Sequence, residues 1–389
     1  HGVRGFRARH AARGARGVTA AGSPPGVAAR SRRTVRLERR LDVPRWLPYL
    51  ATLGAVAFAL LVSALILAAV GGDPIRSYLH IVDSAFGDIG VISDTLVKAT
   101  PLILTGLACA LAFRMRLWNI GAEGQLLMGA WGASAVVLVP LLPPGAPALA
   151  VIPAMTVAGF AAGALWGFIP GLLKARLAVN EIIVTLMLNY VAALWLAFWV
   201  FGPWSEGGFQ LTAQFPREAW LPRLTDLAAQ VPALGGLTVH LGLAFALAAA
   251  VAVWFILRRS RWGYEIRLTG DSPSAARYAG VDIARNTIAI FMISGGLAGL
   301  AGMAEVSGVV HRLQQAISPG YGFTAIIVAY IARFNPLGVI VAAILFGALI
   351  LAGREIQPAG VPGMIQGIVL FSLIASEVVL RYRIRLVRG

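Results

Sequence analysis

The stretch RLWNIGAEGQLLMGA sets an arginine, an asparagine, a glutamate and a glutamine between two apolar segments. Its amides, Asn119 and Gln125, and its carboxylate, Glu123, are strong hydrogen-bonding groups. If the stretch stays at a membrane interface, Glu123 is a solvated turn residue. If it folds into a helix bundle, the charge costs about 2.5–3.5 kcal/mol and needs a partner. Arg114 and Arg116 are the partners within reach.

A second set of side chains with similar chemistry follows further along the chain. Asn189 and Tyr190 fall about eight residues into the apolar segment 182–201, which corresponds to a depth of about 12 Å along a helix. Trp131 and Tyr330 add aromatic rings. An amide hydrogen-bonds hydroxyl groups, and a ring stacks on another ring. Each of these side chains also suits a hydrogen bond or contact between two helices, and the residues alone leave both interpretations open.

No combination of residues predicts catalysis or a metal site. The five histidines are scattered and Cys109 is the only cysteine, so no ligand cluster or internal disulfide is expected. The phosphate-binding pattern G-x-x-x-x-G-K-S/T is absent, and the only lysines are Lys98 and Lys174. We therefore expect no catalytic residue and no cofactor in this chain, and we do not expect an enzyme.

The composition predicts an all-α protein that crosses a membrane many times. Hydrophobic residues make up 58% of the chain, charged residues 13%, and the mean hydropathy is +0.77. A soluble protein needs more polar cover than this. Several uncharged runs approach the 18 residues that span about 30 Å of hydrocarbon, and they lack the alternation of a membrane β-barrel.

We expect about ten membrane segments, with eight as the lower bound, in a permease domain over 47–380. They fall near 47–70, 96–113, 126–142, 148–173, 182–201, 239–257, 286–304, 323–333, 337–352 and 362–380. The segment 323–333 makes only about 16 Å of helix and is flanked by the helix breakers SPGYGF and FNP. It is therefore expected to be a re-entrant or broken helix inside the bundle.

The charge distribution predicts the orientation. With the N-terminus in the cytoplasm, 27 Arg and Lys fall on the cytoplasmic side and five on the outer side, as the positive-inside rule requires. The net charge of +16 therefore reflects membrane topology, and no nucleic-acid partner is expected. Residues 1–46 are expected to form a disordered basic cytoplasmic arm, and 381–389 a cytoplasmic tail.

Glycines recur at intervals of four in two of the expected spans. Such a ridge lets another helix approach closely, either within one bundle or at a subunit interface. The residues concerned are Gly159, Gly163, Gly167 and Gly171 in one span, and Gly295 and Gly299 in the other.

The long cytoplasmic loop 258–285 contains the signals of a short helix. Asp271 or Ser272 can cap its start, and Pro273 suits the first helical position. Gly280 can end it in a left-handed conformation. The loop is either a solvated connector or a docking knob for a cytoplasmic partner. On the outer side, 202–238 contains Trp204 and Trp220 and is expected to be ordered, facing an external partner.

Four stretches together resemble the membrane permeases of binding-protein-dependent ABC importers. The likeness is to the sugar-type branch, and above all to its nucleoside members, and it covers roughly 45–380. The stretches are WNIGAEGQLLMGA (118–130), NEIIVTLMLNYVA (180–192), GDSPSAARYAGVD (270–282) and GYGFTAIIVAYIARFNPLG (320–338).

The resemblance implies a multi-pass permease of the bacterial plasma (inner) membrane. It implies a second permease subunit, identical or different, an ABC ATPase subunit that binds the ATP, and an extracytoplasmic solute-binding lipoprotein. The solute is expected to be a nucleoside or a related simple sugar. The side chains expected to line the path, from their own chemistry, are Asn119, Glu123, Gln125, Trp131, Asn189, Tyr190 and Tyr330. The implied ATPase-coupling residues are Gly270, Asp271, Pro273, Ala275, Ala276, Arg277 and Gly280.

The alternative is a self-sufficient secondary transporter or channel for a small polar solute. Such proteins place ionisable groups in the middle of the membrane for coupling. Here Glu123, Glu181 and Glu377 all fall near the ends of predicted spans, which argues against this class.

Overall fold

The computed structural model describes residues 33–39, 44, 46–139, 141–143, 145–353 and 360–388. The chain divides into two units. The helical unit lies within Val43–Leu380, and the second unit holds a pair of strands.

Strand β1 (Arg33–Arg39) pairs antiparallel with β2 (Tyr382–Arg388), in a register that sets Arg33 opposite Arg388. Here the structure differs from the predicted disordered arm and tail. The reason is local sequence: apolar and polar residues alternate in TVRLE and in YRIRLV, which is the pattern of a strand. The rest of the predicted arm, apart from Pro44 and Trp46, lies outside the described residues.

The helical unit begins at Leu47, as predicted. Its first six helices are α1 (Leu47–Ala69), α2 (Pro74–Phe86), α3 (Ile89–Arg114), α4 (Ala122–Leu138), α5 (Ala148–Leu177) and α6 (Glu181–Phe201). Three short 3-10 helices follow: η1 (Arg217–Ala219), η2 (Leu224–Leu227) and η3 (Pro232–Leu234).

The second half begins with α7 (Gly242–Arg259), α8 (Arg261–Asp271) and α9 (Pro273–Tyr278). It continues with α10 (Ile283–Glu305), the π-helical turn η4 (Val306–Val310), α11 (Tyr321–Ile331), α12 (Pro336–Ala352) and α13 (Val361–Arg381).

The predicted fold class is confirmed. Seven helices of the described chain are long and apolar enough to cross a membrane: α1, α3, α5, α6, α7, α10 with η4, and α13. The shorter apolar helices α11 and α12, together with the 17-residue α4, account for the other three predicted segments. Helix α2, whose N-cap is Asp73, lies outside the predicted segments.

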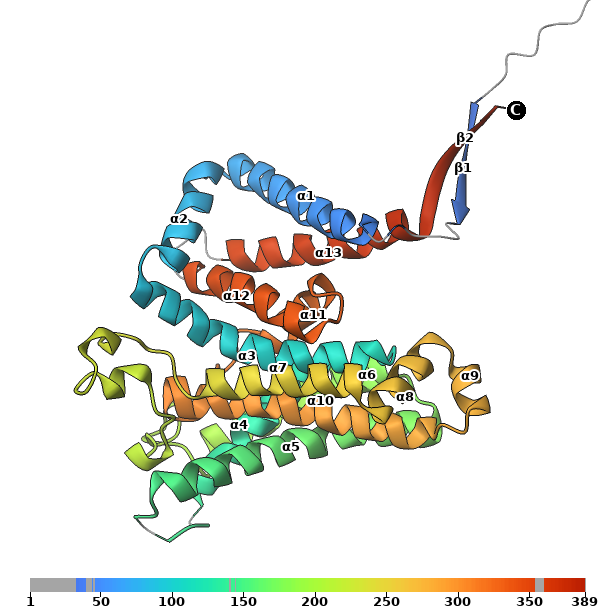
Figure 1. The fold of residues 1–389 in the computed structure, drawn as a ribbon. Coiled ribbons are helices and arrows are strands. Elements are labelled where there is room, and N and C mark those ends of the chain that lie inside the picture. Colours follow the sequence, from blue (N-terminus) through green and yellow to red (C-terminus); the bar gives the residue numbers. More distant parts are fainter. Residues whose placement is uncertain are drawn as a thin grey trace, which may run out of the picture. The chain divides into compact units, whose positions relative to one another are not determined.

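Helix α3 is the centre of the helical unit (Figure 1). It packs against α7, α10, α11 and α12, and almost every residue from Val97 to Phe113 is buried. A helix that is apolar all round is expected to be enclosed by other helices. One consequence is that Lys98, in this helix, must find a partner inside the protein.

The glycine ridges join helices of the same chain. An added Cβ on Gly163 of α5 would lie 2.3 Å from the carbonyl oxygen of Gly295 in α10, and one on Gly167 would lie 2.2 Å from that of Phe291. An added Cβ on Gly129 of α4 would also meet the α10 backbone, at Gly299. The ridges therefore serve packing within one bundle.

The segment between α6 and α7, residues 202–241, is ordered as expected. The amide of Thr212 donates to the carbonyl of Leu313, and that of Leu221 to the carbonyl of Ser307, so the segment is tied to η4 and to the chain beyond it. The His311 ring stacks on the Trp220 ring, with 3.7 Å between the two ring centres. Burial, and then the Arg223 charge, lowers the pKa of His311 to about 4, so a neutral ring accepts the Arg223 hydrogen bond.

Replacing Gly163 by Ala should destabilise the protein by about 1–3 kcal/mol, because the new methyl meets backbone that cannot rotate away. The measurement is the thermal unfolding midpoint of the full chain in detergent. Gly54→Ala in α1 is the matched control, since no atom lies within 4 Å of its added Cβ. Equal midpoints for the two variants would contradict this packing.

Candidate functional site

The polar residues between α3 and α4 form a buried hydrogen-bond network. The Asn119 amide nitrogen donates to Gln125 Oε1 and to Ser294 Oγ, both at 2.8 Å, and its Oδ1 accepts from the Gly121 N–H. Ser294 of α10 in turn donates to the carbonyl oxygen of Ala108 in α3. Both amides are enclosed, so Asn119 and Gln125 join α3, α4 and α10 and do not face an open path in this conformation.

Glu123 enters the bundle, and its partner is the start of α11. Its Oε2 accepts the backbone N–H of Gly322 at 2.7 Å, and the Ser318 hydroxyl also bonds to the carboxylate. The first N–H groups of a helix lack partners within the helix and favour a negative charge. The predicted pairing with Arg114 or Arg116 is therefore wrong, because the end of a broken helix supplies the compensation.

Asn189 fastens α6 to the same region. Its Oδ1 accepts the N–H of Gly124 at 2.8 Å, and its amide nitrogen donates to the carbonyl of Ile120 at 2.9 Å. An added Cβ on Gly124 would lie 2.8 Å from Asn189 Oδ1, so α4 and α6 touch there. Of the two interpretations left open, the hydrogen bond between helices is the one the structure contains.

A buried ion pair lies beside the start of α11. Lys98 Nζ is 3.5 Å from Glu305 Oε1 and 3.4 Å from the hydroxyl of Tyr321, the first residue of α11. Lys98 is 7% exposed and Glu305 3%. Lys98 falls within the expected span 96–113, but neither residue is among the predicted site residues. The signal was present, because ionisable groups in apolar helices are rare and usually functional.

The three aromatic path candidates lie apart. Trp131 belongs to a cluster with Trp195, Trp199 and Trp204, near the 202–241 segment. Tyr330 stacks on Trp118 at 5.9 Å, near the other end of the bundle. Tyr190 is 64% exposed on α6 and points away from the packed helices. The predicted path residues therefore do not line one pocket within a single chain.

The short helix in loop 258–285 forms as predicted. Ser272 caps α9, accepting the Ala275 N–H at 3.3 Å, and Pro273 is its first residue. Gly280 follows with φ +77°, the left-handed conformation expected after the helix. Asp271, the alternative cap, ends α8 instead.

Some of the predicted coupling residues are buried and others are exposed. Ala276 is fully buried and so cannot belong to a docking surface, in contrast to its predicted role. Gly270 is buried where α8 meets the end of α3, because an added Cβ would lie 2.2 Å from the Arg114 carbonyl oxygen. Asp271, Pro273, Ala275, Arg277 and Gly280 are exposed. Tyr278, which was not singled out, is 97% exposed.

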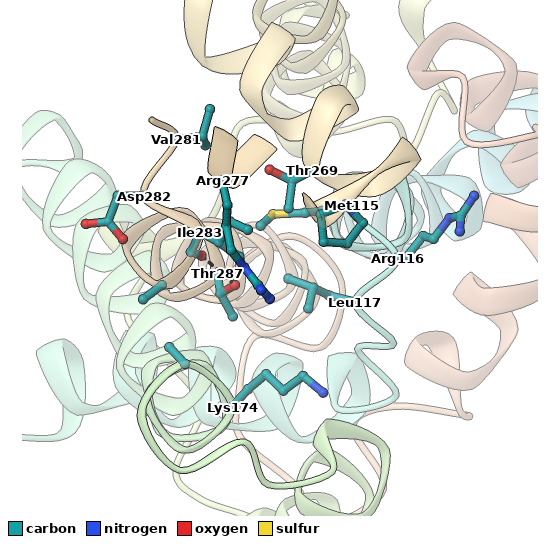
Figure 2. A pocket seen from close by; sticks show the side chains of 13 residues that line it. Met115, Arg116, Leu117, Lys174, Thr269, Arg277, Val281, Asp282, Ile283 and Thr287 are labelled. Carbon is teal, nitrogen blue, oxygen red and sulfur yellow. Dashed lines mark hydrogen bonds between the residues drawn. The ribbon is translucent and has the colours of Figure 1, made fainter. Parts of the chain in front are cut away.

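A cavity of about 560 Å³ lies behind α9 (Figure 2). Arg277 reaches from α9 toward Thr287 of α10, and Lys174 of α5 lies on the opposite side. Lys174 pairs with Glu181 at 2.7 Å. The Thr269 hydroxyl borders the cavity and has no hydrogen-bond partner in the described part of the protein. Of the α9 residues, Ala276 is buried, whereas Pro273 and Arg277 line the cavity.

No group of three or more His, Cys, Asp and Glu that could hold a metal ion occurs in the described ranges. Cys109 is buried and forms no disulfide there. The chemistry that this site can perform is hydrogen bonding and ion pairing between helices.

Replacing Glu305 by Gln should destabilise the protein by about 3–5 kcal/mol, because the Lys98 charge is then left buried without its counter-ion. Adding Lys98→Met should recover part of this loss. The measurement is thermal unfolding of the single and double variants. As a control, Arg76→Met breaks the exposed pair with Asp73 and should change stability by at most about 1 kcal/mol. A double variant as unstable as the sum of the single changes would refute the pairing.

Curated relatives match nearly the whole chain. The glucose ABC transporter permease protein TsgB13 of Haloferax volcanii is 38% identical over 90% of this chain and 93% of its own length. The guanosine ABC transporter permease protein NupP of Bacillus subtilis is 36% identical over 87% and 95%. The nucleoside ABC transporter permease protein NupB of Lactococcus lactis is 33% identical over 84% and 89%.

A family model described as branched-chain amino acid transport system / permease component matches residues 91–374. The matched segment contains the polar network, the Lys98–Glu305 pair, α9 and α11. The resemblance to ABC importer permeases of the sugar and nucleoside branch is confirmed by these relatives. The chain therefore belongs to this family of membrane-spanning transport-system permeases.

Proposed function

We propose that the chain is the permease subunit of an ABC importer for a nucleoside or a related simple sugar. The observation that carries this proposal is the match to NupP, NupB and TsgB13 along nearly the entire chain. The names of those proteins assign guanosine, nucleosides and glucose to them. All of these solutes carry several hydroxyl groups, which hydrogen-bonding side chains along a path can contact.

The translocation path lies between two permease chains rather than through one. The interior of the helical unit is filled, since α3 is enclosed and the candidate amides bond to one another. Helix α6 packs mainly on α4 and leaves Ile183, Met187, Tyr190 and Leu194 exposed. A second permease, identical or different, would cover this face, and Tyr190 is the predicted path residue best placed to meet the solute there.

The energy comes from a separate ATPase that docks on α9. Helix α9 has only six residues and carries Arg277 and the almost fully exposed Tyr278. It therefore forms a small knob that can fit into a groove of the ATPase. Its cap and its left-handed end make it a rigid piece. Because α8 joins it to α7 and α10 follows it, movement of the knob is transmitted to two membrane-spanning helices.

The end of the bundle with α8 and α9 faces the cytoplasm, and so do both chain termini. That end holds Arg114, Arg116, Lys174 and the arginines of 258–285, which matches the positive-inside rule. The opposite end, with 202–241, receives solute from an extracytoplasmic binding lipoprotein. The setting we propose is a bacterial plasma (inner) membrane.

The test of the proposed function is uptake by proteoliposomes that contain the chain, the second permease where it is a different protein, the ATPase and the binding protein. We expect accumulation of labelled guanosine or glucose against a gradient only when ATP is present on the ATPase side. Competition between the two solutes and ribose identifies the class that is carried. Uphill accumulation by the chain alone, driven by a proton gradient, would show a secondary transporter instead.

Replacing Tyr278 by Glu should reduce the amount of ATPase that co-purifies with the chain by at least about tenfold, or about 1.4 kcal/mol of binding free energy. A charged side chain in the docking groove would be desolvated without a partner. Tyr264→Glu on α8 is the control, because Tyr264 is also exposed but lies outside the knob. Equal recovery of the ATPase with both variants would show that α9 is not part of the docking surface.

A further inference from the structure

Five arginines line one cavity at the α8–α9 end of the bundle. The cavity has a volume of about 440 Å³, and none of its lining side chains is acidic. The arginines are Arg114, Arg258, Arg259, Arg267 and Arg333. We call this the arginine cavity. It is distinct from the cavity behind α9, with which it shares no lining residue.

Three segments far apart in the chain bring these arginines together. Arg114 is the last residue of α3, and Arg258 and Arg259 are the last two of α7. Arg267 lies on α8, while Arg333 lies in the turn between α11 and α12. The positive-inside rule accounts for basic residues on this side of the membrane but not for their convergence on one cavity.

The turn that contributes Arg333 has an unusual backbone. Arg333 and Phe334 have φ of +51° and +59°, a left-handed conformation that non-glycine residues rarely adopt and that costs free energy. The Phe334 ring packs against Phe113 and Tyr330. Asn335 then caps α12, accepting the Leu337 N–H at 3.2 Å. The cavity therefore borders the start of a helix, where backbone N–H groups also favour an anion.

The five charges have no acidic counter-ion in the described part of the protein. The ion pairs of Arg76, Lys98 and Lys174 include none of the five. Arg258 stacks on Trp254, with its guanidinium carbon 5.7 Å from the ring centre, and Arg333 lies 5.9 Å from the ring of Tyr49. Rings hold a guanidinium in place but do not neutralise it. An anion between the arginines would remove their mutual repulsion.

The surroundings favour a lipid as the source of that anion. The cavity is at the end of α7, a helix that is long and apolar enough to cross a membrane. Trp254 lies in its lining, and tryptophan is enriched at the level of lipid headgroups. Val251 and Phe255, one turn from the cavity, are both exposed and offer an apolar surface to acyl chains. Basic pockets between helices at this level suit phospholipid headgroups.

We propose that the arginine cavity binds the phosphate of an anionic phospholipid such as phosphatidylglycerol. The planar guanidinium groups can each donate two parallel hydrogen bonds to phosphate oxygens. The bound headgroup joins the end of α3, the α7–α8 junction and the α11–α12 turn. It thereby fixes α8, the helix that leads into α9. This proposal is independent of which solute the permease carries.

The experiment measures lipids retained by the purified full chain, using native mass spectrometry after equilibration with equal amounts of phosphatidylglycerol and phosphatidylcholine. We expect the wild type to retain phosphatidylglycerol selectively. The Arg267→Gln, Arg333→Gln double variant should retain at least about fivefold less. Arg261→Gln is the control, since Arg261 begins the same helix as Arg267 and does not line the cavity. The single variant Arg259→Gln repeats the test with one cavity arginine replaced instead of two.

Three results would overturn the proposal. The first is retention of phosphatidylglycerol by the cavity variants at the wild-type level. The second is an equal loss in Arg261→Gln, which would indicate general attraction to the basic face. The third is a rise in the wild-type unfolding midpoint with inorganic phosphate that equals the rise with phosphatidylglycerol, which would assign the site to free phosphate. A rise with phosphatidylglycerol alone, absent in the cavity variants, supports the lipid.

Discussion

The start of α11 lies inside the protein, and the N–H groups of its first turn have no partner within the helix. The need to pair these groups is the constraint on which the rest of the structure depends. A helix of eleven residues is too short to cross a membrane, so its first turn lies among other helices. Backbone donors at that depth must be paired. The Glu123 carboxylate accepts the N–H of Gly322, and the Ser318 hydroxyl accepts those of Gly320 and Tyr321. Glu123, the charged residue between two apolar segments, therefore caps a helix that is distant in the sequence.

The same joint organises its neighbours. Tyr321 reaches Lys98 of α3, which pairs with Glu305 at the end of α10. Asn189 holds α6 against the first turn of α4, which also carries Glu123. Five membrane segments thus meet where α4 and α11 begin, and glycine contacts bring α4, α5 and α10 together along their length. A joint whose polar groups are paired in this way suits a rigid scaffold.

The sequence predicted those features whose causes are local. Hydropathy located the membrane segments, and Ser272, Pro273 and Gly280 defined α9 through rules that act over a few residues. It did not find the partner of Glu123, because Gly322 is 199 positions away and contributes only a backbone amide. It also misjudged Ala276, since a six-residue helix gives too little periodicity to show which side is buried. The convergence of Arg114, Arg267 and Arg333 depends on packing that no local pattern encodes.

The most direct test of this account is hydrogen–deuterium exchange of the backbone amides in residues 320–331, compared between the wild type and Glu123→Ala. If the carboxylate holds the start of α11, its first turn should exchange markedly faster in the variant, while peptides from α12 exchange at the wild-type rate. Unchanged exchange at the start of α11 would mean that the buried helix end is stabilised by other groups, and it would contradict the role assigned to Glu123.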